Sequence, residues 1–186
     1  MKPAINSEPL NLHPWNTGFQ WEPISGPFEV ISPEQAKQFN EDGYCLVKDA
    51  FPAELLKELI VDLDELDRQT EEALQTQENG RVFIVESGAI TFGSQVVKGS
   101  KAARKMATHE VIAGICRDII GSDVRLYHDQ FVYKKPEKPR RFPWHQDNGY
   151  TFTEPQQYLT CWVALTDATI ENGCPQIAPG IHKFGT

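Results

Sequence analysis

The sequence predicts an α+β domain in which helices come first and a β part of jelly-roll or cupin-like type follows. Apolar residues recur at helical spacing in the first half of the 186-residue chain, most clearly in residues 52–66. From residue 124 onward, short alternating segments rich in β-branched and aromatic residues are separated by turns. Helices followed by a run of strands are typical of α+β folds, and closing the strands into a roll removes exposed sheet edges.

The composition excludes several classes of protein. The chain is 40% hydrophobic and 24% charged with a net charge of -8, which is ordinary for a globular domain and unfavourable for nucleic acid or an anionic membrane as partner. It has neither a membrane-length apolar run nor the layout of a secretory signal. Its four cysteines lack zinc-site spacing, so we expect reduced thiols and a cytoplasmic location.

Residues 1–31 contain five prolines and show no sustained period, which predicts an irregular N-terminal arm. Its aromatic residues Trp15, Phe19 and Trp21 are expected to pack on the surface of the domain, which we place at residues 32–186. Within that domain, Ser32 and Pro33 carry the signals of a helix start.

The remaining elements follow from spacing and turn residues. The first helix is expected to end at Gly43 and a longer one to begin at Pro52, with its acidic residues forming a solvated face. The other expected elements are a strand at 44–47, a loop at 69–80, a strand at 82–85, a basic turn at 98–105 and a helix at 108–120. In the second half we expect strands at 124–133, around 145, at 158–166 and at 174–178, with a basic loop at 134–141.

One stretch carries the main functional signal. In an extended strand, side chains two residues apart point to the same face, so His145 and Asp147 would project together with Gln146 turned away. An imidazole beside a carboxylate is two thirds of the 2-His-1-carboxylate set of non-haem iron oxygenases. Taken alone, this spacing also fits an ordinary surface pair.

Several stretches in the same order resemble the phytanoyl-CoA dioxygenase family over roughly residues 30–186. They read SPEQAKQFNEDGYCLVKDAFP, DQFVYKKP, PWHQDNGY and YLTCWVALTDATIENGCPQIAPGIHK. The resemblance implies a double-stranded β-helix with flanking N-terminal helices, and an Fe(II)/2-oxoglutarate-dependent dioxygenase that hydroxylates a small-molecule metabolite. It assigns His145 and Asp147 as iron ligands.

The resemblance also implies positions for the cosubstrate. Trp162 matches a residue that lines the 2-oxoglutarate pocket, although plain core packing explains it equally well. Gln130 matches a pocket residue, and Lys134 matches a cosubstrate-binding lysine. Because the adjacent loop varies in length, the lysine match can shift by one position to Lys135.

The chain departs from the family pattern at its end. Relatives carry a second metal His, followed by an Arg, beyond the PGxHK segment, whereas this sequence stops at Thr186. His182 matches the His of PGxHK, which is not the iron ligand in relatives; its use as a substitute ligand is the alternative. We therefore expect a portion of a longer oxygenase or a truncated product, with an incomplete roll, self-association through open sheet edges, and weak Fe(II) binding.

Two other functions remain open from the sequence. The chain can be a non-catalytic cupin-like binding or scaffold domain that keeps the fold without iron chemistry. It can also be a zinc or iron lyase that does not use 2-oxoglutarate. Loss of bound metal on replacing His145 or Asp147 separates the metal enzymes from the scaffold, and a response to 2-oxoglutarate separates the dioxygenase from the lyase.

Overall fold

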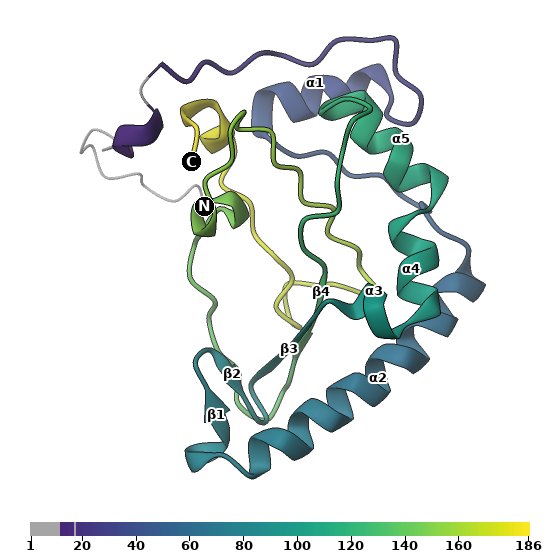
Figure 1. The fold of residues 1–186 in the computed structure, drawn as a ribbon, viewed down its shortest axis with the longest axis vertical. Coiled ribbons are helices and arrows are strands. Elements are labelled where there is room, and N and C mark those ends of the chain that lie inside the picture. The colour runs from purple at the N-terminus through teal and green to yellow at the C-terminus, as the bar shows by residue number, and fades with distance from the viewer. Residues whose placement is uncertain (1–11, 17) are drawn as a thin grey trace.

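The computed structural model describes residues 12–16 and 18–186 (Figure 1). A long helix, α2, runs along one side of the molecule, with α1 and α5 near one end and a β hairpin near the other (Figure 1). The helices are α1 (Pro33–Asp42), α2 (Ala53–Gln75), α3 (Val96–Gly99), α4 (Lys101–Ala107) and α5 (Glu110–Ile119). The strands are β1 (Arg81–Val82), β2 (Val85–Glu86), β3 (Ile90–Ser94) and β4 (Gln130–Lys134). Short 3-10 turns lie at Pro14–Asn16, Glu78–Gly80, Asp147–Tyr150 and Ile181–Phe184.

Helix α1 begins and ends where its sequence predicts. The Ser32 hydroxyl accepts the backbone N–H of Gln35, and the Gln35 side chain accepts the N–H of Ser32, which completes a capping box. At the other end, Gly43 adopts a left-handed φ of 83° and donates its N–H to the carbonyl of Phe39. These local contacts confirm the predicted helix and fix its ends.

Helical structure extends further than we predicted in two places. Residues 69–75 continue α2 instead of forming a loop, because they are good helix formers and Leu74 is buried. The expected basic turn at 98–105 lies within α3 and α4, where Ser100 caps α4 by accepting the N–H of Ala103 at 2.9 Å. The charged residues of α4 face outward, while Met106 is buried. Helix α5 lies within the predicted range, and His109 caps its first turn.

The hydrophobic core forms where α2 meets α3, α4 and β4. It comprises Leu55, Leu59, Leu63, Val96, Ala102, Ala103, Met106 and Phe131. Val163 and Leu165, from the far end of the sequence, are partly buried against this cluster. The second half of the chain is therefore tied to the helical half by the same apolar residues.

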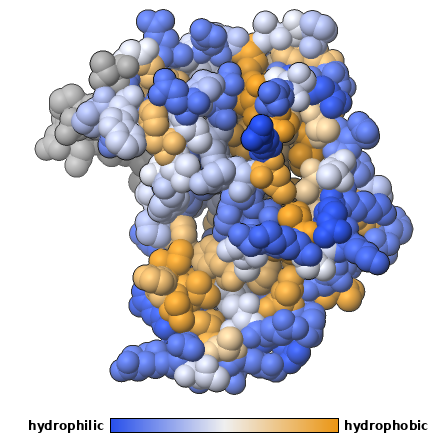
Figure 2. All heavy atoms as spheres, viewed as in Figure 1, coloured by the Kyte–Doolittle hydropathy of each residue, from blue (hydrophilic) through white to orange (hydrophobic). Residues whose placement is uncertain are grey.

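The sheet is open, antiparallel and ordered β1-β2-β3-β4. The predicted strand at 82–85 is broken by a turn: Val82 ends β1, Val85 begins β2 and pairs with it, and Phe83 between them has a φ of 52°. Phe83 is 89% exposed, and orange apolar atoms surround this hairpin in Figure 2. Strand β3 pairs with β4 over five residues, Ile90 opposite Lys134 through Ser94 opposite Gln130, and this is the longest ladder of the sheet.

The other predicted strands are wrong for this structure. Within the described residues, the segments 44–47, 124–129, 144–147, 158–166 and 174–178 join no backbone ladder. A strand needs a hydrogen-bonded neighbour, and an alternating pattern does not supply one. The alternating pattern still indicates which side chains share a face, since Val163 and Leu165 both pack against the core. The α+β class is confirmed, while the described residues form an open sheet and no closed roll.

The described part of the N-terminal arm packs on the domain as expected. The rings of Trp15 and Phe152 lie 5.1 Å apart, and those of Trp21 and Phe39 lie 5.9 Å apart. Among the described residues, no helix is long and apolar enough to cross a membrane.

The carboxylate of Asp118, near the end of α5, anchors the arm. It accepts the backbone N–H groups of Glu29, Val30 and Ile31 at 2.7, 2.8 and 3.0 Å. Partial burial by itself would raise the pKa of this carboxyl group, but the three hydrogen bonds outweigh burial and lower the pKa below its ordinary value of 3.8.

We expect Asp118→Asn to reduce the free energy of unfolding by about 1–2 kcal/mol at neutral pH, because hydrogen bonds to a charged acceptor are replaced by weaker ones. A group whose folded pKa is lowered stabilises above its unfolded pKa, and the stabilisation is lost as the pH falls through the folded value. The difference between the variant and the wild type should therefore shrink below about pH 4. Urea unfolding at pH 7 and pH 3 measures this difference in the free energy of unfolding; a difference as large at pH 3 as at pH 7 would contradict this account.

Candidate metal centre

His145 and Asp147 meet, although not on the strand that we predicted. Asp147 begins a 3-10 turn, while Gln146 keeps an extended backbone with φ −110° and ψ 138°. One extended residue between them places the two flanking side chains on one side. Their atoms Nε2 and Oδ1 lie 3.3 Å apart, and Gln146 points elsewhere, donating to the carbonyl of Gly185 at 3.1 Å.

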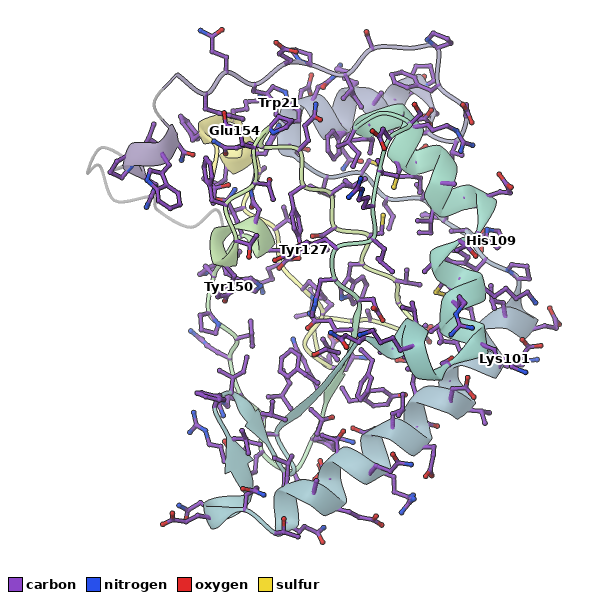
Figure 3. The ribbon with its side chains drawn as sticks, in the orientation of Figure 1. Trp21, Lys101, His109, Tyr127, Tyr150 and Glu154 are labelled. Carbon is purple, nitrogen blue, oxygen red and sulfur yellow. The ribbon has the colours of Figure 1, made fainter. Side chains whose placement is uncertain are left out.

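The imidazole of His145 is oriented by its own segment. Its Nδ1 lies 2.8 Å from the carbonyl oxygen of Pro143, and a hydrogen bond to a carbonyl requires that Nδ1 carry the proton. This contact fixes the ring, as the outer partner of a metal-bound histidine does. The ring of Phe142 lies edge-on at 5.1 Å and that of Tyr150, labelled in Figure 3, lies at 5.8 Å.

The carboxylate of Asp147 is held by a residue from a separate segment. Its Oδ2 accepts a hydrogen bond from the Thr160 hydroxyl at 2.7 Å. Tyr158 lies two residues before Thr160. Burial raises the pKa of the Tyr158 hydroxyl, and the negative charge of Asp147 raises this pKa further. The segment 158–160 therefore forms one wall beside the carboxylate.

This geometry leaves two acceptors facing each other. With the proton on Nδ1, Nε2 of His145 presents a lone pair toward the negatively charged Oδ1 of Asp147. Such a contact is favourable only if a cation lies between the two atoms, either a second proton on the imidazole or a metal ion. Bonds of about 2.1 Å to an octahedral ion place neighbouring ligands about 3.0 Å apart. The observed 3.3 Å therefore fits a bound divalent metal after a small movement.

A third ligand is absent from the described residues, which contain no group of three or more His, Cys, Asp or Glu side chains arranged to hold a metal ion. The side chains of His145 and Asp147 are also 33% and 41% exposed. The described part of the site thus offers two protein ligands and access for solvent.

His182, the alternative ligand, occupies a different pocket. Its ring lies 4.4 Å from that of Trp21 and 6.3 Å from that of Phe39, with Nε2 3.3 Å from the carbonyl of Asn40. Burial lowers the pKa of His182. The ring lies against Gly43, where an added Cβ would come within 2.4 Å of Nδ1. In this structure His182 is a packing residue between the arm and α1.

The expected cosubstrate residues make no direct contact with the pair in the described part of the chain. No hydrogen bond, ion pair or ring contact among the described residues joins Gln130, Lys134 or Trp162 to His145 or Asp147.

The expected cosubstrate residues lie in surroundings that differ from one another. Trp162 is 58% exposed, and Gln130 lies beside His128, with Oε1 and Nε2 3.4 Å apart. Lys134 donates to the carbonyl of Gly173, whereas Lys135 forms an ion pair with Asp67 on α2. Of the two lysines, Lys134 is the more available for an anionic ligand, because its partner is a neutral group.

An α+β domain with an imidazole and a carboxylate placed to share a cation defines a candidate metal-binding protein. The family model of phytanoyl-CoA dioxygenase matches residues 39–186, and the chain belongs to that family.

Curated relatives agree with the family match. The chain is 27% identical to phytanoyl-CoA dioxygenase domain-containing protein 1 of Rattus norvegicus, over 83% of this chain and 67% of the relative. It is 27% identical to ectoine dioxygenase of Stutzerimonas stutzeri, over 82% of this chain and 51% of the relative. A shorter match, 40% identical over 60 residues, is to phytanoyl-CoA dioxygenase of Arabidopsis thaliana. The chain thus spans between about half and two thirds of the first two relatives. No solved structure matches it.

Proposed function

We propose that this chain supplies part of the Fe(II) centre of a 2-oxoglutarate-dependent dioxygenase that hydroxylates a small-molecule metabolite. The observation that carries the proposal is the 3.3 Å approach of Nε2 of His145 to Oδ1 of Asp147, with the imidazole proton held on the opposite nitrogen. Membership of the family supports the choice of iron and 2-oxoglutarate, and the imidazole–carboxylate donor set is one that non-haem Fe(II) uses.

In this proposal the iron and 2-oxoglutarate, when bound, supply the oxidative chemistry, and the protein binds and orients them. His145 and Asp147 hold the metal, while the carbonyl of Pro143 keeps Nε2 free for it. The rings of Phe142 and Tyr150 flank the imidazole, and the metal position stays open to solvent. Lys134 offers a positive charge for a carboxylate of the cosubstrate, with Gln130 and Trp162 as further pocket residues.

The proposal includes the double-stranded β-helix of the family for the second half of the chain. The packing of Val163 and Leu165 against the core supports it. An open sheet with an exposed apolar hairpin turn at Phe83 also supports self-association of this chain.

Thermal unfolding with metal and cosubstrate tests the proposed function. We expect Fe(II) under anaerobic conditions to raise the melting temperature slightly, and 2-oxoglutarate to raise it further only when Fe(II) is present, because the cosubstrate would chelate the bound ion. With two protein ligands we expect weak binding and little succinate release in air with ascorbate.

The other outcomes separate the alternatives. A response to metal without any effect of 2-oxoglutarate favours a lyase, and no response to either favours a non-catalytic scaffold. Robust succinate release would show that another residue completes the site.

A further inference from the structure

We propose that Thr160 is a positioning residue for the metal-binding carboxylate: its hydroxyl holds Oδ2 of Asp147, so that Oδ1 alone faces the imidazole. This inference rests on the proposed function, because it assigns a role at the same metal centre. It concerns a residue from a segment 13 positions further along the chain.

The hydrogen bond has the geometry of a charge-assisted contact. A hydroxyl that donates to a carboxylate at 2.7 Å is at the usual distance for a hydroxyl donor and within the range of charge-assisted bonds. The terminal torsion of an aspartate is broad, so an unanchored carboxylate rotates easily and can present both oxygens. Oδ2 accepts the hydrogen bond from Thr160, and Oδ1 lies 3.3 Å from Nε2 of His145. One oxygen is therefore held by the protein, and the other is left to bind the metal.

The donor itself is held in place by its neighbours. Tyr158 lies two residues before Thr160, and its ring contacts the ring of Tyr127 at a centroid distance of 5.8 Å. The Tyr127 hydroxyl in turn lies 3.0 Å from the Thr151 hydroxyl, just after the turn that begins at Asp147. Tyr127 and Tyr150 mark this region in Figure 3. The Thr160 segment and the metal-ligand segment are thus joined at two points.

Two variants separate this role from a simple structural contact. Thr160→Val keeps the branched shape and removes the donor, whereas Thr160→Ser keeps the hydroxyl. Thr166 provides a matched control, since it is an exposed threonine of the same stretch with no hydrogen bond among the described residues. Thr166→Val should therefore behave as the wild type in every measurement.

The test measures Fe(II) affinity under anaerobic conditions by calorimetry, together with the infrared carboxylate bands of the metal-loaded protein. We expect Thr160→Val to weaken Fe(II) binding by about 10- to 100-fold, the range found for outer partners of metal ligands, and Thr160→Ser to restore most of it. We also expect the splitting between the two carboxylate stretching bands to narrow in Thr160→Val, as one-oxygen coordination gives way to two-oxygen coordination.

Wild-type affinity in Thr160→Val overturns the inference and leaves the proposed function standing. A loss of affinity with unchanged carboxylate bands does the same, because Thr160 would then not control how Asp147 binds the metal. Absence of metal binding by the wild-type chain itself overturns both.

Discussion

Replacing His145 with alanine is expected to lower Fe(II) affinity by more than about 100-fold, beyond the range typical of outer-shell partners. The described residues offer only two ligands, so losing one leaves a single protein donor in competition with water. Asp147→Ala should have a similar effect, because it removes the anionic ligand and leaves the Thr160 hydroxyl without its acceptor. Anaerobic titration calorimetry with Fe(II) measures both changes.

Two exposed residues of the same types provide controls. His128 has one long contact, 3.4 Å to Gln130, and Asp123 is exposed without a hydrogen bond or ion pair among the described residues. Alanine at either position should leave Fe(II) affinity unchanged. Equal losses in the controls and in His145→Ala would attribute metal binding to nonspecific surface groups and would remove the support for the proposed function.

The largest effect on stability is expected at Asp67. Asp67 lies on α2, is 8% exposed, and accepts hydrogen bonds from the fully buried Thr91 on β3 and from the ammonium group of Lys135 after β4. The same ammonium nitrogen lies 5.2 Å from the centre of the Tyr133 ring. One carboxylate therefore links the long helix to β3 and to the residue that follows β4.

We expect Asp67→Ala to reduce the free energy of unfolding by about 3–5 kcal/mol, because it leaves a largely buried cation and a buried hydroxyl without their acceptor. Glu58, on the same helix, is exposed and lies 4.0 Å from Lys105, so Glu58→Ala should change stability by less than about 1 kcal/mol. Denaturant unfolding measures the loss of stability in each variant. Similar losses for Asp67→Ala and Glu58→Ala would refute the assignment.

Removing both charges with Asp67→Leu and Lys135→Met should recover much of the stability that Asp67→Ala loses.

The helices could be predicted where their signals are local. The capping box of Ser32 and Gln35 and the left-handed Gly43 involve residues within a few positions of each other, and the structure has all of these contacts. The extension of α2 was missed because its last turns are mostly polar, although several of their residues are good helix formers and Leu74 is buried. Polarity alone therefore does not separate a solvated helix from a loop.

Strands were harder to predict because a ladder depends on a distant partner. The alternation at 158–166 indicated which side chains share a face, and Val163 and Leu165 do reach the core, but the pattern did not show whether a neighbouring strand would pair. The candidate site likewise has one feature that local spacing predicts and one that only the tertiary fold sets. The spacing of His145 and Asp147 predicted their approach, whereas the contact from Thr160 is set by tertiary folding and had no local signal.

The central claim is that a divalent ion binds between Nε2 of His145 and Oδ1 of Asp147. X-ray absorption spectroscopy of the Fe(II)-loaded chain tests it most directly, because an imidazole ligand adds multiple-scattering features that oxygen ligands lack. We expect one imidazole and otherwise oxygen donors at about 2.1 Å, with the imidazole features lost in His145→Ala. A spectrum without imidazole, or one that His145→Ala leaves unchanged, would contradict the account.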